Sequence, residues 1–152
     1  MLSRRAALLG LAATLPAAAL IRPAAAATPP WYSEGGIAID GSDAVAYFDG
    51  NGPVAGRRDI AVEWGGTTWL FANAANREKF EMNPDSYAPQ YGGYCAYAVS
   101  KGYTATTDPK AWTLHDGKLY LNYSRTVRAL WARDIPGNVE KGNANWPGVL
   151  SA

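Results

Sequence analysis

Two short turns in this sequence each join a pair of segments in which apolar residues alternate with others. Gly65-Gly66 lies between residues 60–64 and 67–71, and Asp116-Gly117 lies between residues 112–115 and 118–121. Two-residue loops of this composition accept the positive φ angles of a tight β-turn, so each set predicts an antiparallel hairpin. The rest of the fold has to be built around these two hairpins.

The alternation also predicts the register of both hairpins. In the first, the expected cross-strand pairs are Val62 with Trp69 and Ile60 with Phe71, on one face with Trp64. In the second, they are Leu114 with Leu119 and Trp112 with Leu121, with His115, Lys118 and Tyr120 on the opposite face. Each hairpin thus offers a strongly apolar face to a core, and the aromatic pairs fix the register.

Short helices are expected between and after the hairpins. Asn73 is a predicted N-cap of a helix reaching about Met82, and Ser124 is the predicted N-cap of a helix through Arg133, broken by residues 135–137. Residues 45–48 read as a strand, and residues 94–100 as either a brief helix or a buried strand. Together these elements predict an α+β domain with a small antiparallel sheet and short helices packed on one side.

The first 27 residues have the features of an export signal. Arg4-Arg5 precedes an alanine-rich apolar run over residues 6–21, and Ala-x-Ala cleavage points follow near Ala26 and Ala27. Paired arginines favour the twin-arginine type of signal, with an ordinary secretory signal as the alternative. The run is shorter than the ~20 residues of a spanning helix, which argues against a permanent membrane anchor. We expect a periplasmic or otherwise exported bacterial protein.

Residues 28–36 are predicted to be a linker, and residues 37–150 a single domain. Without residues 1–27 the chain keeps 11 basic and 13 acidic residues, a formal charge of −2. This charge gives no basic patch for nucleic acid. The chain's one cysteine cannot form an internal disulfide, so packing alone has to hold the fold together.

The candidate site is the stretch from Asn83 to Tyr103, which contains five tyrosines, the only cysteine and the pair Gly92-Gly93. Tyrosines around one thiol are suited to a pocket for a small ligand, and the predicted ligand-binding residues are Cys95, Tyr91, Tyr94 and Tyr97. The alternative is that these side chains simply fill the core. Gly93 is expected to need positive φ or a close backbone approach.

The sequence resembles the YHS-domain family, especially its exported single-domain bacterial members. The resemblance extends from about Ile37 to Pro147. It rests on residues 66–71, 76–80, 83–87, 91–96, 116–123, 134–137 and 145–147. It implies a YHS-type fold. In metal-handling members of the family, cysteines are thought to bind metal at positions that correspond here to Phe71-Ala72 and Asn76, so the resemblance does not transfer that site to this chain.

Three kinds of function remain open on these residues. The leading hypothesis is a non-enzymatic module that binds a small ligand, a metal ion or a partner protein near Cys95. A copper or zinc site would use Cys95, His115 and Met82. The alternatives are a thiol-dependent enzyme with Cys95 as nucleophile and His115 as base, and a structural accessory module of a periplasmic complex.

Overall fold

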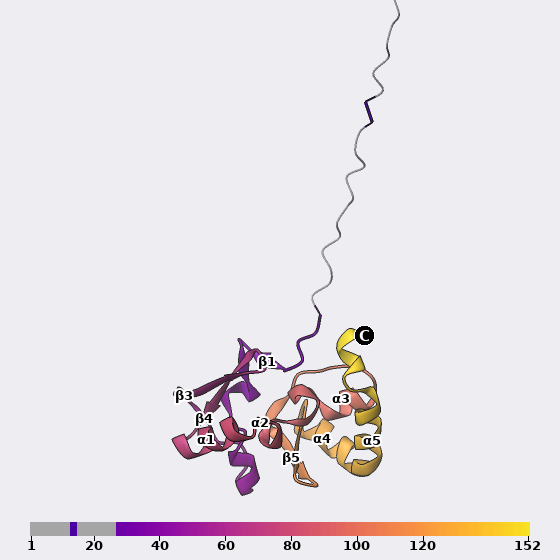
Figure 1. Cartoon of the computed structure of the whole chain (residues 1–152). Helices are drawn as coiled ribbons and strands as arrows, with labels where there is room; N and C mark the ends of the chain where they lie inside the picture. The colour runs from indigo at the N-terminus through magenta and orange to yellow at the C-terminus, as the bar shows by residue number, and fades with distance from the viewer. Residues whose placement is uncertain (1–12, 15–26) are drawn as a thin grey trace, which may run out of the picture.

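The computed structural model describes residues 13–14 and 27–152 (Figure 1). The predicted signal over residues 1–27 therefore lies, apart from residues 13, 14 and 27, outside the described residues. The strands are β1 (Ser33–Glu34), β2 (Ile37–Ala38), β3 (Arg57–Trp64), β4 (Thr67–Phe71), β5 (Asp108–His115) and β6 (Lys118–Asn122). The α-helices are α1 (Ala74–Met82), α2 (Pro84–Tyr87), α3 (Ala96–Ser100), α4 (Arg125–Trp131) and α5 (Ile135–Asn145). Among the described residues, no helix has both the length and the apolar composition needed to span a membrane.

The strands form two sheets, and the fold is of the α+β class as predicted. One sheet has the order β1-β2-β4-β3, and the other consists of β5 and β6 alone. Both predicted hairpins are present, but they belong to different sheets. The first sheet is mixed rather than wholly antiparallel, because β2 pairs with β4 in parallel through Ile37 and Thr68.

The register prediction is correct for three of the four pairs. Val62 lies opposite Trp69, Leu114 opposite Leu119, and Trp112 opposite Leu121. The fourth pair is wrong, because an irregularity between Arg57 and Ala61 shifts β3 so that Arg57, not Ile60, lies opposite Phe71. A β-bulge inserts extra residues in one strand, and a pattern of alternation does not reveal it.

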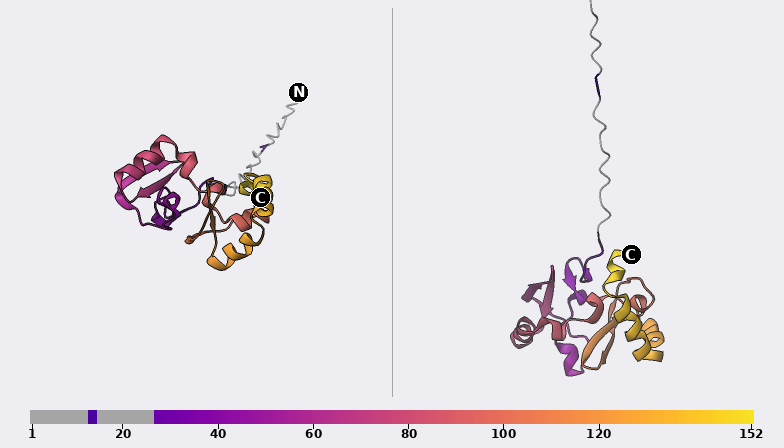
Figure 2. Two further views of the ribbon diagram at one scale, coloured as in Figure 1. Left: turned by 90° about the horizontal axis from the view of Figure 1, so that it is seen from below. Right: turned by 45° about the vertical axis from the view of Figure 1, so that its right-hand side comes forward.

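The β5–β6 hairpin, orange in Figure 2, lies between the first sheet and helices α4 and α5. Its side chains contribute to two apolar cores. Leu119 and Leu121 are buried in the first core, with residues of β4 and α1 such as Trp69 and Phe80. Tyr120 points to the opposite face and is buried in the second core, with Trp131 at the end of α4. Because side chains alternate along a strand, one hairpin supplies both cores.

The helix starts at Asn73 and Ser124 agree with the predictions. The Asn73 side chain accepts the N–H of Asn76 at 2.8 Å, and the Ser124 hydroxyl accepts the N–H of Val127 at 3.1 Å. The open choice for residues 94–100 is resolved as helix α3. The helical run from Ser124 does break, but at Asp134, whose backbone is not helical, and residues 135–137 form the first turn of α5, where a proline is tolerated.

The predicted strand over residues 45–48 is wrong, since a 3-10 helix, η2 (Ala46–Asp49), lies there. The buried carboxylate of Asp43 accepts the N–H groups of Val45 at 2.8 Å and Ala46 at 3.2 Å. These bonds satisfy donors at the start of the turn and favour the helical conformation over an extended one.

The segment predicted as a linker is part of the packed fold. Trp31 packs against Trp64 and Trp69, with ring centroids 4.8 and 5.4 Å apart. Tyr32 donates its N–H to the carbonyl of Gly92 at 2.8 Å, and β1 pairs with β2. Burying the apolar surface of Trp31 against these two rings stabilises the contact of this segment with the first sheet.

Candidate functional site

The turn before Cys95 has an unusual backbone. Tyr91, Gly92 and Gly93, all within the 3-10 helix η3 (Gln90–Gly93), have φ angles of 57°, 62° and 79°. The expectation for Gly93 is confirmed. Gly92 is needed for a further reason, because a Cβ at this position would collide with the carbonyl oxygen of Pro30. This turn therefore depends on glycine for both its conformation and its contact with the N-terminal segment.

Cys95 lies immediately before α3 and is 1% exposed. Its sulfur accepts the N–H of Tyr123 at 3.2 Å, and the thiol donates to Oδ1 of Asn122 at 3.5 Å. The same Asn122 oxygen accepts the N–H of Tyr97 at 3.0 Å, so Asn122, at the end of β6, satisfies a donor of the first turn of α3. The hydrogen-bonding capacity of the thiol is thus used by β6 and the residue after it.

A hollow of about 300 Å³ opens beside Cys95, and we call it the tyrosine hollow. It is lined by Cys95, Tyr97, Ala98, Tyr103, Ala105, Tyr123 and Val127. Tyr103 and Tyr123 are 55% and 58% exposed, and they are two of the three large hydrophobic side chains that are exposed in the described part of the chain. Cys95 and Tyr97 were predicted from the sequence, whereas Tyr123 and Val127 come from a region that the sequence alone does not connect with them.

The other two predicted ligand residues lie elsewhere. The Tyr94 hydroxyl donates to the carbonyl of Pro29 at 2.6 Å, and its ring belongs to the second core. Tyr91 lines a separate hollow of about 450 Å³, the junction pocket. The junction pocket lies where the N-terminal segment, the turn after α2 and the C-terminal segment meet, and it is lined by Pro30, Trp31, Asp85, Ala88, Pro89, Gln90, Tyr91, Gly92, Trp146, Pro147 and Leu150.

The three residues of the predicted metal site occupy different elements. Met82 ends α1 and is 79% exposed, whereas Cys95 is buried before α3. His115 ends β5, where its Nε2 lies 3.3 Å from the carboxylate of Asp116. Within the described residues no hydrogen bond joins any two of the three, and no group of three or more His, Cys, Asp or Glu residues could hold a metal ion. The structure therefore adds no geometric support to this ligand set.

Ala72 and Asn76 lie where metal-handling YHS domains are thought to have cysteines, and both residues donate a hydrogen bond to the carboxylate of Asp43. Oδ2 of Asp43 accepts the backbone N–H of Ala72 at 2.9 Å and the side-chain amide of Asn76 at 2.8 Å. This carboxylate is fully buried and is bound by four donors in all. The arrangement is a hydrogen-bonded link between β4, α1 and η2, a structural role that fits a buried charge.

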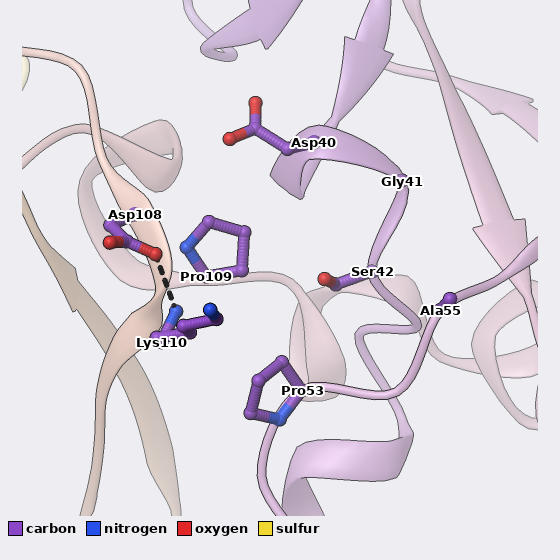
Figure 3. A pocket seen from close by; sticks show the side chains of 8 residues that line it. All are labelled: Asp40, Gly41, Ser42, Pro53, Ala55, Asp108, Pro109 and Lys110. Atoms are coloured by element: carbon purple, nitrogen blue, oxygen red, sulfur yellow. Dashed lines mark hydrogen bonds between the residues drawn. The ribbon is translucent and has the colours of Figure 1, made fainter.

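A third hollow, of about 300 Å³, has three charged residues in its lining (Figure 3). Asp40, Ser42, Asp108 and Lys110 line it together with proline and small residues. Burial raises the pKa of Asp40, and the nearby carboxylates of Glu34 and Asp108 raise it further. The backbone of Asp40 is in the left-handed region, with φ 49°, a conformation that few residues other than glycine adopt.

Comparison of the chain with protein-family models, with curated proteins and with solved structures finds no match. The YHS resemblance and the export signal therefore stay predictions from the sequence.

Proposed function

We propose that this chain is an exported YHS-type domain that binds a small apolar ligand in the tyrosine hollow, without catalysis. The observation that carries the proposal is the coincidence of the hollow with Tyr103 and Tyr123, both more than half exposed. Exposed apolar side chains gathered around a concavity are typical of binding sites. Three tyrosine rings favour an aromatic ligand, and their hydroxyls can orient a polar group on it.

Cys95 contributes to the wall of this hollow. Its thiol donates to Asn122 and its sulfur accepts from Tyr123, and its hydrogen bonds include none to His115. A thiol nucleophile needs access to solvent and a base within hydrogen-bond reach. These contacts favour a binding role for the hollow over the alternative of a thiol-dependent enzyme.

The test is a titration of the isotopically labelled domain with indole and p-cresol, followed by NMR. Both probes are expected to shift the resonances of Tyr97, Tyr103 and Tyr123. Val127→Trp places a ring in the hollow from α4 and should abolish the shifts, whereas Ala129→Trp, at an exposed position of the same helix, should preserve them. Shifts that persist in Val127→Trp, or no shifts with either probe, would refute the proposal.

Copper(I) or zinc stays the alternative ligand predicted from the sequence, because Cys95 offers a soft sulfur donor in the wall of the hollow, although the described residues bring no second metal ligand to it. Metal analysis of protein purified from the periplasm decides between the two. Stoichiometric metal that is lost in Cys95→Ser supports the metal, and metal-free protein in both forms argues against it.

The proposed export depends on the arginine pair. Replacing Arg4 and Arg5 by lysine should retain the protein in the cytoplasm if the signal is of the twin-arginine type. Unchanged export of this variant would instead indicate an ordinary secretory signal, and a cytoplasmic location of the unaltered chain would refute export.

A further inference from the structure

The junction pocket is a second candidate binding site, separate from the tyrosine hollow. Its volume of about 450 Å³ is within the range of small-molecule sites, roughly 300–1,000 Å³. It shares no lining residue with the tyrosine hollow. Three aromatic residues from distant parts of the chain, Trp31, Tyr91 and Trp146, contribute to its wall.

These rings are held in place by contacts outside the pocket. The Tyr91 hydroxyl bonds to Oδ1 of Asn143 at 3.0 Å and to the carbonyl of Val139 at 3.2 Å, both on α5. Trp31 is fixed by Trp64 and Trp69 of the first sheet. A ligand would therefore meet aromatic surface that is already ordered, which lowers the entropy cost of binding.

Gly92 brings the aromatic groups together. A Cβ on Gly92 would lie 3.0 Å from Cη2 of Trp146 as well as against Pro30. The carbonyl of Gly92 accepts the N–H of Tyr32 at 2.8 Å, which ties the N-terminal segment to the turn. The absence of a side chain at this position thus allows the three walls of the pocket to approach one another.

The charge of the lining indicates the kind of ligand. Asp85 is the one charged residue among those that line the pocket, and it forms no salt bridge with another described residue. Aromatic faces attract cations, and a nearby carboxylate adds to the attraction. A bare metal ion does not fit, because the lining offers one carboxylate and no cysteine or histidine. Calcium requires six to eight oxygen ligands, and zinc needs three or four ligands from Cys, His or carboxylate side chains.

We propose that the junction pocket binds a small organic cation, of the quaternary alkylammonium class, with Trp31, Tyr91 and Trp146 around its alkyl groups and Asp85 near its charge. Such a cation has an apolar body for the rings and a diffuse positive charge for the carboxylate. This combination matches both features of the lining.

The experiment compares choline with 3,3-dimethylbutan-1-ol, which has the same shape without the charge. Binding to the full mature domain is measured by calorimetry and by the indole N–H resonances of Trp31 and Trp146. Choline is expected to bind at least about tenfold more tightly than the alcohol, a difference of about 1.4 kcal/mol. Equal affinities, or no binding of either probe at millimolar concentration, would overturn the proposal.

Two variants locate the site. Asp85→Asn, at an exposed position, should weaken choline binding several-fold and leave the alcohol unaffected. Trp146→Leu should weaken both probes, whereas Tyr103→Ser, in the tyrosine hollow, should alter neither. Unchanged choline affinity in Asp85→Asn, with circular dichroism showing a folded protein, would also overturn the assignment.

Discussion

The Asn76 side-chain amide donates a hydrogen bond of 2.8 Å to the carboxylate of Asp43, and both groups are buried. The bond joins α1 to a residue 33 positions earlier in the chain. Asp43 also accepts backbone N–H groups of Val45, Ala46 and Ala72. One carboxylate therefore organises the contact between the first sheet, η2 and α1.

Replacing Asp43 should be among the most destabilising single changes. Asp43→Ala leaves three backbone donors and the Asn76 amide without their acceptor, and each unsatisfied buried donor costs about 1–3 kcal/mol. We expect the free energy of unfolding in urea to fall by at least about 3 kcal/mol. Asp59→Ala, which removes a surface pair with Arg57, is the control and should cost no more than about 1 kcal/mol. Similar losses in the two variants would contradict the role assigned to Asp43.

Gly92→Ala should displace the N-terminal segment. The added methyl group collides with the Pro30 carbonyl, and φ at this position is 62°. Gly66→Ala is the matched control, because Gly66 has φ 79° but no atom near the position of a Cβ. The control should cost about 1–2 kcal/mol from the backbone alone. Gly92→Ala should cost clearly more and shift tryptophan fluorescence to the red as Trp31 becomes exposed, and equal costs with unchanged emission would argue against this contact.

Stability should fall at alkaline pH through Tyr32. Burial, followed by the charges of Asp40 and Glu34, raises the pKa of Tyr32 from 10.0 to about 12. A raised folded-state pKa gives stability that is complete below about pH 10 and is lost as the pH rises through about 12. Tyr32→Phe should therefore lose less stability between these pH values, as measured by urea midpoints. An identical pH profile for the variant and the original protein would count against this linkage, and Tyr103→Phe, at the surface, serves as control.

Asp40→Asn should stabilise the protein at neutral pH. The pKa of Asp40 is raised above 3.8 by burial and by Glu34 and Asp108, so its charged form is disfavoured in the fold. Protonation of Asp40 therefore stabilises the folded state at pH values below the ordinary pKa of the carboxyl. This stabilisation is lost as the pH rises through the raised pKa of Asp40 in the folded protein. The variant should gain less than about 1 kcal/mol at pH 7, because the site is partly exposed.

This electrostatic gain should disappear at acidic pH, where Asp40 is protonated. No gain from the backbone is expected to remain there, because aspartate and asparagine both visit the left-handed region. Asp116→Asn is the matched control: Asp116 also has positive φ, 50°, but its carboxylate lies 3.3 Å from Nε2 of His115, so the change alters a contact with His115 and should give no comparable gain. A gain in stability for Asp40→Asn that is the same at neutral and at acidic pH would contradict this electrostatic explanation.

The site could be predicted in part. The concentration of tyrosines around Cys95 predicted a binding site in this region, and Cys95 and Tyr97 do line one hollow. The sequence could not show that Tyr91 faces a different pocket, because the left-handed turn over residues 91–93 separates it from Tyr94 and Cys95. The sequence did not indicate that Tyr123 and Trp146 line these hollows, because they reach them from later parts of the chain.

By itself, the sequence determined the two hairpins, three of their four cross-strand pairs and the caps at Asn73 and Ser124. These features depend on neighbouring residues, through turn geometry, alternation and local hydrogen bonds. Only the tertiary structure decided that Tyr120 is buried in a second core, that Trp31 docks on the first sheet and that Asp43 binds Asn76. Those contacts join residues far apart in the chain, and their free energy comes from burial and hydrogen bonds that exist only once the elements have packed together.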